Sequence, residues 1–175
     1  MTDTDRLKAL IRHVPDFPKA GILFYDISTL LSDATGLRLA VDCLAKPFEG
    51  KPIDRVVGIE SRGFIFGSAV AKELGTGFVP VRKPGKLPAE TVRAEYALEY
   101  GTDALEMHRD ALQPGENVLV IDDLLATGGT AHATADLISQ VGATVFGFGF
   151  LIELISLKGR TRLARHEVFT ALRYE

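Results

Sequence analysis

The stretch that decides the fold runs from residue 118 to residue 130 and reads Val118-Leu119-Val120-Ile121-Asp122-Asp123-Leu124-Leu125-Ala126-Thr127-Gly128-Gly129-Thr130. Its first four residues form an unbroken aliphatic run, which is typical of a strand buried on both faces in a parallel sheet. Two adjacent carboxylates follow, then a short turn with two glycines and a helix expected over about residues 130–141. Glycines let successive N–H groups point inward, and a helix N-terminus favours negative charge. The turn is therefore predicted to bind one phosphate group, with hydroxyl donors from Thr127 and Thr130.

The paired acids Asp122 and Asp123 suggest what carries that phosphate. Carboxylates accept hydrogen bonds from the vicinal hydroxyls of a sugar phosphate, and they can hold Mg²⁺ through water, since this ion keeps several waters. The stretch is not a Walker loop, because the lysine and the glycine spacing of that motif are absent. Asp-Asp or Gly-Gly alone could be an ordinary turn. The order of strand, two acids, Thr-Gly-Gly-Thr and helix favours a sugar-phosphate site.

Outward from this stretch, strand and helix patterns alternate. Strands are expected over 56–59, 78–81, 144–151 and 168–172, with a helical pattern running from Phe66 to Leu74. Pro80 is an awkward fit for a central strand. This alternation predicts an α/β fold with a mainly parallel, twisted sheet flanked by helices, in which ligands bind at the carboxyl ends of the strands.

Other segments predict elements around that sheet. Helices are expected over 4–14, with Thr4 as N-cap, over 37–44, and over 104–112. Between residues 87 and 100 polar and apolar residues alternate with period two, which indicates a strand or hairpin arm.

Composition sets the limits on function. A chain of 175 residues fits one domain, with 46% apolar and 25% charged residues. The net charge of −3 argues against general nucleic-acid binding, and no stretch approaches the roughly 20 apolar residues that cross a membrane. The single Cys43 and the polar start of the chain, which is neither a signal nor a transit peptide, predict a cytoplasmic protein. The four histidines show no metal-ligand spacing.

The segment 122–130 closely resembles the phosphoribosyl pyrophosphate motif of the type I phosphoribosyltransferase family, in the form found in its adenine-specific branch. Five further stretches resemble the same branch. They occur in the family's order, and the resemblance covers nearly the whole chain. The stretches are Phe17-Pro18-Lys19-Ala20-Gly21-Ile22-Leu23-Phe24-Tyr25-Asp26-Ile27, Glu60-Ser61-Arg62-Gly63-Phe64-Ile65-Phe66-Gly67, Arg82-Lys83-Pro84-Gly85-Lys86-Leu87-Pro88, Leu98-Glu99-Tyr100-Gly101 and Leu154-Ile155-Ser156-Leu157-Lys158-Gly159. One departure is Tyr25, where many relatives carry a basic residue, so the polar role of this stretch is left open.

The resemblance implies a type I phosphoribosyltransferase fold in one domain, with an N-terminal hood (residues 1–34) over the base and a flexible flap (residues 87–108). It implies transfer of the phosphoribosyl group to adenine in purine salvage, giving AMP and pyrophosphate, with Mg²⁺ as cofactor. It also implies a homodimer, because in related enzymes a residue of the basic stretch reaches the neighbouring subunit's site.

The resemblance also assigns roles to residues. Asp122, Asp123 and the loop of Ala126, Thr127, Gly128, Gly129 and Thr130 would hold the phosphoribosyl group, with Mg²⁺ near both aspartates through water or substrate. Glu99 would be the general acid/base and Tyr100 a flap residue against the ligands. Pyrophosphate would lie on Ser61, Arg62, Arg82, Lys83 and Lys86, and adenine on Ile22, Leu23, Phe24, Leu125 and Leu154.

Each of these residues also has a plainer interpretation. Arg62 could form a surface ion pair, the basic stretch could be a solvated loop, Glu99 could be inert on a polar strand face, and Leu154 could be core packing. The same chemistry on a 6-oxopurine or orotate is one alternative function. A non-catalytic regulator that binds phosphoribosyl pyrophosphate is another.

Overall fold

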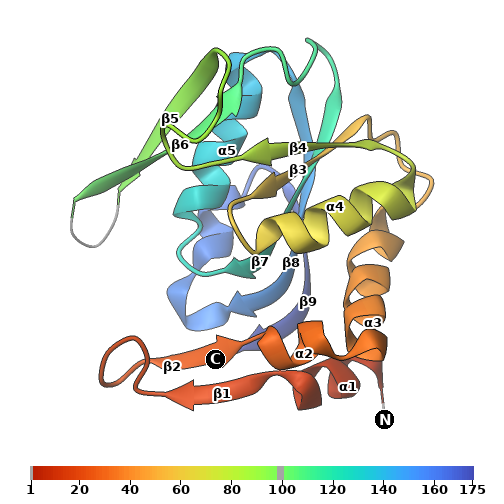
Figure 1. Cartoon of the computed structure of the whole chain (residues 1–175), viewed down its shortest axis with the longest axis vertical. Helices are drawn as coiled ribbons and strands as arrows, with labels where there is room; N and C mark the ends of the chain where they lie inside the picture. Colours follow the sequence, from red (N-terminus) through yellow and green to blue (C-terminus); the bar gives the residue numbers. More distant parts are fainter. Residues whose placement is uncertain (1, 98–100) are drawn as a thin grey trace.

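A parallel sheet forms the centre of the computed structural model, which describes residues 2–97 and 101–175 (Figure 1). Its five strands lie in the order β4-β3-β7-β8-β9, and every neighbouring pair is parallel. They are β3 (Arg55–Ile59), β4 (Gly77–Val81), β7 (Asn117–Leu125), β8 (Thr144–Leu154) and β9 (Glu167–Tyr174). The predicted parallel α/β fold is confirmed. β4 is an edge strand, where the missing N–H of Pro80 is tolerated.

Helices and a hairpin cover the two faces of this sheet (Figure 1). One face carries α3 (Ala34–Ala45) and α4 (Gly63–Leu74), and the other carries α5 (Gly129–Gln140) with the hairpin of β5 (Thr91–Ala97) and β6 (Thr102–His108). Shorter helical segments are α1 (Asp3–Leu10), α2 (Ser28–Ser32), η1 (Lys46–Phe48), η2 (Ile155–Leu157) and η3 (Gly159–Leu163). The strands β1 (Arg12–Pro15) and β2 (Leu23–Asp26) form a separate antiparallel hairpin.

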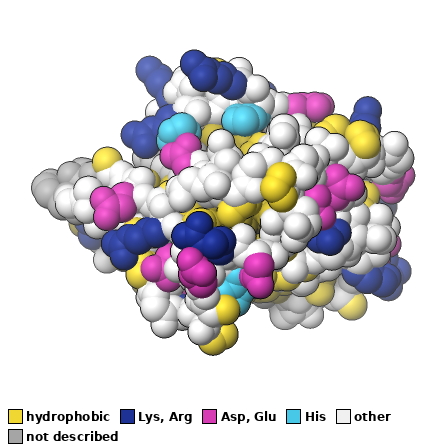
Figure 2. Space-filling view, turned by 90° about the horizontal axis from the view of Figure 1, so that it is seen from above, with side chains coloured by type: hydrophobic (Ala, Val, Ile, Leu, Met, Phe, Trp, Pro, Cys, Tyr) yellow, Lys and Arg dark blue, Asp and Glu magenta, His cyan; other side chains and the backbone are white. Residues whose placement is uncertain are grey.

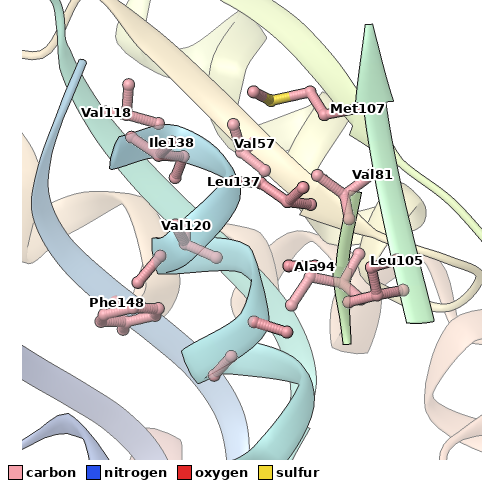
Figure 3. Packing of buried hydrophobic residues seen from close by; sticks show 14 of the residues in the cluster. Val57, Val81, Ala94, Leu105, Met107, Val118, Val120, Leu137, Ile138 and Phe148 are labelled. Carbon is pink, nitrogen blue, oxygen red and sulfur yellow. The ribbon is translucent and has the colours of Figure 1, made fainter. Parts of the chain in front are cut away.

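β7 is buried on both faces because its residues alternate between two apolar cores. Val118 and Val120 belong to the core beneath α5, and Figure 3 shows them near Leu137 and Ile138 of that helix. Leu119 and Ile121 face the opposite core, beneath α3 and α4. The two burial patterns together explain why the strand is an unbroken aliphatic run.

Two of the expected helices are wrong at least in part. Residues 104–108 form strand β6, in which every residue from Thr102 to His108 pairs with β5 and Leu105 and Met107 are buried. The apolar spacing that suggested a helix is overridden by this strand pairing. At the N-terminus α1 ends at Leu10, and residues 12–15 pair with β2 instead. Thr2, not Thr4, is the N-cap, because its side chain accepts from the Asp5 N–H.

A buried carboxylate joins β8, η3 and β9. Glu153 is only 5% exposed and accepts hydrogen bonds from Arg160 at 2.7 and 3.0 Å, from Thr170 Oγ1 at 2.9 Å and from Arg173 Nε at 3.1 Å. The bonds from Arg160, then those from Arg173 and Thr170, outweigh burial and lower the pKa of Glu153 to about 2. This cluster holds the segment after β8 against the sheet.

Replacing Glu153 by Gln is expected to lower the free energy of unfolding at neutral pH by about 3 kcal/mol, since the charged form is the one that the folded state favours. The folded-state pKa lies below the ordinary value of 4.5, so this contribution is present above about pH 4.5 and is lost as the pH falls towards 2. Urea denaturation of both proteins between pH 7 and the lowest pH at which they fold measures the difference. Glu90→Gln, in an exposed pair with Arg109, is the control and is expected to cost under about 0.5 kcal/mol. A difference for Glu153→Gln that stays constant with pH would contradict the assignment.

Candidate active site

The glycine turn after β7 lies at the floor of a cavity of about 720 Å³. Ala126, Thr127, Gly128, Gly129 and Thr130, which were predicted to hold the phosphoribosyl group, all line it. Gly128 has φ +80°, and α5 begins at the next residue, so the first N–H groups of the helix face this region. The other side of the cavity is formed by Lys83, Tyr96, Asp103, Leu157 and Arg162.

The shape of the turn depends on a contact with a distant glycine. A Cβ on Gly128 would lie 2.6 Å from the Gly159 carbonyl oxygen, and a Cβ on Gly159 would lie 2.2 Å from the Ala126 carbonyl oxygen. Side chains cannot fit at either position without movement of backbone atoms. The two segments therefore close against each other only because both residues are glycine.

The paired acids lie in β7 itself, which continues to Leu125, and both are nearly buried. Asp123 accepts from Arg62 Nε at 2.5 Å. Burial, and then the neighbouring charge of Asp123, raises the pKa of Asp122 well above its ordinary value. Both acids line a smaller cavity of about 360 Å³ with Ile59, Glu60, Ser61, Arg62, Leu124, Ala126 and Thr130. The structure thus brings Ser61 and Arg62 to the aspartates and to the edge of the glycine turn.

Glu60 contacts three residues of the basic stretch 82–86, which follows β4. Its carboxylate accepts from the Lys83 backbone N–H at 2.9 Å, from Lys86 Nζ at 2.5 Å and from Arg82 Nη2 at 3.3 Å. Burial alone would raise the pKa of Glu60, but the bonds from Lys86, the Lys83 N–H and Arg82 lower it to about 2. The predicted cations therefore lie beside the loop of Ser61. Arg82, which by resemblance would reach the neighbouring subunit's site, contacts the Glu60 carboxylate of its own chain here.

Lys83 connects the basic stretch to the β5–β6 hairpin. Its Nζ donates to Tyr96 Oη at 2.7 Å and to the Asp103 carboxylate. All three residues border the cavity above the glycine turn. Glu99 and Tyr100, the predicted acid/base and flap residue, lie outside the described residues, between the two strands of this hairpin.

The β1–β2 hairpin and α2 enclose a third cavity, of about 560 Å³. Phe17 and Phe24 lie edge to face there with ring centroids 5.1 Å apart, and the Arg62 guanidinium lies 5.7 Å from the Phe24 centroid. Arg62 lines this cavity and the one at the aspartates, so it joins them. Ile22 and Leu23, on the same hairpin, are 37% and 44% exposed.

The predicted base-binding residues are only partly brought together. Leu125 is 1% exposed and packs in the core beneath α5, yet it borders the cavity above the glycine turn. Its neighbour Leu124 lines that cavity and also the smaller one at the paired acids. Leu154 is half-buried and packs against the opposite core. Tyr25 stacks on Tyr174 at 4.1 Å between ring centroids, so it serves packing rather than charge. Leu124, Gly159 and Arg162 are site residues that sequence reasoning did not select.

The fold and these adjoining cavities define the chain as a phosphoribosyltransferase. Residues 33–171 match the family described as phosphoribosyl transferase domain. Relatives named adenine phosphoribosyltransferase include those of Solibacter usitatus, 59% identical with 97% of this chain and 98% of the relative covered, and of Acaryochloris marina, 61% identical with 90% and 92% covered.

Solved structures similar to this chain are also adenine phosphoribosyltransferases. The adenine phosphoribosyltransferase of Thermoanaerobacter pseudethanolicus is 48% identical with a TM-score of 0.95, covering 98% of this chain and 99% of that one. The yeast enzyme from Saccharomyces cerevisiae, solved with adenine and an imino-altritol bisphosphate, is 42% identical with a TM-score of 0.91 and coverage of 97% and 98%. The chain belongs to the adenine phosphoribosyltransferase family, as the resemblance in its motifs predicted.

The contact between the two glycines can be tested with a matched pair of variants. Gly128→Ala and Gly50→Ala both place a side chain at positive φ, +80° and +70°, but only the first meets backbone within 4 Å. Gly50→Ala is expected to cost about 1–2 kcal/mol of unfolding free energy from backbone conformation. Gly128→Ala is expected to cost about 1–3 kcal/mol more because the Gly159 carbonyl must move. Equal losses in urea denaturation would show that the turn does not depend on this contact.

Proposed function

We propose that this chain transfers the 5-phosphoribosyl group from phosphoribosyl pyrophosphate to adenine, giving AMP and pyrophosphate in purine salvage. The observation that carries the proposal is a row of adjoining cavities, from the glycine turn past the paired acids to the aromatic residues of the hood. Its relatives named for this activity cover nearly its whole length. The Giardia lamblia relative, 37% identical, was solved with 9-deazaadenine.

The phosphoribosyl end would bind where β7 gives way to α5. The 5-phosphate would accept hydrogen bonds from the backbone of residues 126–130 and from Thr127 and Thr130, and the dipole of α5 would favour its charge. The ribose hydroxyls would donate to Asp122 and Asp123. Arg62 fixes Asp123 in place, so this acceptor is already oriented.

Pyrophosphate would lie on Ser61 and Arg62, with Arg82, Lys83 and Lys86 beside them. Arg82 and Lys86 contact Glu60 and Lys83 contacts Asp103, so each cation would exchange a carboxylate for a phosphate oxygen. Fixed cations stabilise the charge that develops on a leaving group.

Mg²⁺ is the proposed cofactor, and the oxygen donors of the site suit it. Among the described residues no cluster of three or more metal-binding side chains occurs. Mg²⁺ prefers oxygen ligands and keeps several waters, which fits two carboxylates acting through water or substrate oxygens. Asp122 and Asp123 would hold it, and it would supply positive charge against the pyrophosphate.

Adenine would lie under the hood against Phe24, with backbone groups near Ile22 and Leu23 at its polar edge. The predicted Leu125 is proposed for the opposite wall together with Leu124, since both line the cavity above the glycine turn and Leu124 also lines the one at the aspartates. Leu154 is proposed at the rim. A ring nitrogen would then form its bond to the anomeric carbon as the bond from that carbon to pyrophosphate breaks, with inversion.

Proton transfer is assigned to Glu99 and exclusion of water to the flap. Glu99 would accept the proton that adenine loses, and the flap with Tyr100 would exclude water, which would otherwise capture the sugar. The hood and flap would belong to one domain comprising the whole chain. A cytoplasmic homodimer is also proposed. Within the described residues no helix is long and apolar enough to cross a membrane.

The activity is tested by mixing the protein with Mg²⁺, phosphoribosyl pyrophosphate and one base at a time, then following nucleotide formation by chromatography. Adenine is expected to give AMP and pyrophosphate, with hypoxanthine, guanine and orotate at least about a hundredfold slower, because the site must leave polar groups of those bases unpaired. A chelator is expected to abolish turnover. Preference for another base would contradict the substrate. Tight phosphoribosyl pyrophosphate binding without turnover would indicate a regulator.

Replacing Glu99 by Leu is expected to lower kcat by about a hundredfold or more and to leave the KM for phosphoribosyl pyrophosphate within about threefold, because proton transfer acts in the transition state. Steady-state kinetics measure both values. Glu95→Leu is the matched control, since Glu95 is an exposed carboxylate of the same hairpin. Wild-type kcat in Glu99→Leu would rule out the acid/base role.

A further inference from the structure

A cavity of about 540 Å³ lies beside the proposed active site, between α5 and the segment of residues 161–166, which comprises the end of η3 and the residues after it. The α5 side presents His132, Asp136 and Ser139, and the other side presents Thr161, Arg162, Arg165 and His166. We call this cavity the side pocket. Figure 2 shows positive and negative side chains interspersed over the face seen from above, with histidine and basic side chains gathered along its upper edge.

The arginines of the side pocket differ from their neighbour Arg160. Arg160 is fully engaged by Glu153, Thr170 and the Val168 carbonyl. In contrast, Arg162 and Arg165 form no ion pair with any residue in the described ranges 2–97 and 101–175. The one acid in the lining is Asp136, whose nearest cationic contact is His132 Nε2 at 3.9 Å. Positive groups therefore outnumber negative ones in this pocket.

His166 contacts residues of two neighbouring elements. Its ring packs edge to face on Phe148 with centroids 5.4 Å apart, and its backbone N–H donates to the Leu163 carbonyl at 2.9 Å. Burial, and then the positive charges of His132 and Arg165, lowers the pKa of His166. An anion between these groups would offset the repulsion between their positive charges.

We propose that the side pocket is a second anion site, which takes a phosphate group, either as free inorganic phosphate or as the end of a small phosphomonoester. Arg162 and Arg165 are the charged donors, and guanidinium groups suit phosphate because they present paired N–H donors. The hydroxyls of Ser139 and Thr144 border the same space and add neutral donors. The four ring and guanidinium groups approach from two elements that pack against each other, α5 and the segment 159–166.

Arg162 connects the side pocket to the glycine turn. It lines both cavities, and its Nη1 lies 3.7 Å from where a Cβ of Gly129 would be. A phosphate in the side pocket would draw this guanidinium away from the turn. The consequence, which rests on the proposed function, is weaker binding of phosphoribosyl pyrophosphate when the side pocket is filled.

Binding can be measured through the histidines of the full chain. The protein, with ¹³C-labelled histidine and one equivalent of AMP to occupy the active site, is titrated with inorganic phosphate or glycerol 3-phosphate at constant ionic strength. The ring signals of His132 and His166 are expected to shift and saturate. His13, which packs on Tyr25, and His108, which accepts from the Ala89 N–H, should not respond and serve as internal controls.

The matched variants are Arg165→Gln and Arg38→Gln, the second removing an exposed arginine of α3 that forms no ion pair with a described residue. Arg165→Gln is expected to weaken phosphate binding about tenfold, as loss of one charge-assisted contact does, whereas Arg38→Gln should have no effect. Saturation by either titrant supports the site. Shifts that are linear, shared by all four histidines or unchanged in Arg165→Gln would overturn it.

A kinetic measurement tests the connection through Arg162. Phosphate is expected to raise the KM for phosphoribosyl pyrophosphate less in Arg165→Gln than in Arg38→Gln, and equal rises would overturn the coupling. The histidine signals do not depend on turnover. Absence of AMP formation would therefore reject the proposed function alone, and absence of a saturable shift would reject the side pocket alone.

Discussion

Burial of β7 between two apolar layers constrains every other part of the site. Two carboxylates follow its aliphatic run directly, inside the strand, and they are only 8% and 7% exposed. Because α5 starts four residues after the strand, the helix N-terminus lies beside those carboxylates. The close approach of an acidic pair and an anion-binding helix end is thus a consequence of strand burial.

Charge at this edge of the sheet is balanced within the protein. Arg62 contacts Asp123, Lys83 contacts Asp103, and Lys86 contacts Glu60. A ligand with several negative charges would compete with these carboxylates for the three cations, whereas Arg162, which lines the cavity at the glycine turn, is paired with no described carboxylate. Each contact between a cation and the ligand then contributes less net free energy, because a contact with a carboxylate is lost. In return, the carboxylates hold the cations near the site before the ligand binds.

The sequence was sufficient for the parallel sheet, the glycine turn and the family, because buried strands and phosphate turns leave local patterns. It failed where a distant partner decides the conformation, as in residues 104–108, whose pairing with β5 overrides a helical spacing. Leu124 was not selected although it lines two cavities, because the pattern alone does not show on which face of the strand each of two adjacent leucines lies. The contact of Gly159 with the turn has no local signal at all.

The contact between Gly128 and Gly159 shows that the glycine turn is not an independent structural unit. Within residues 122–130, Gly128 lies against the Gly159 carbonyl, and the Glu153 cluster holds that later segment against the sheet. If the nine-residue motif were grafted into another parallel sheet, its N–H donors would be present, but the Gly159 carbonyl that packs against the turn would be missing. A designed scaffold that reproduces this turn would therefore need the segment around Gly159 as well.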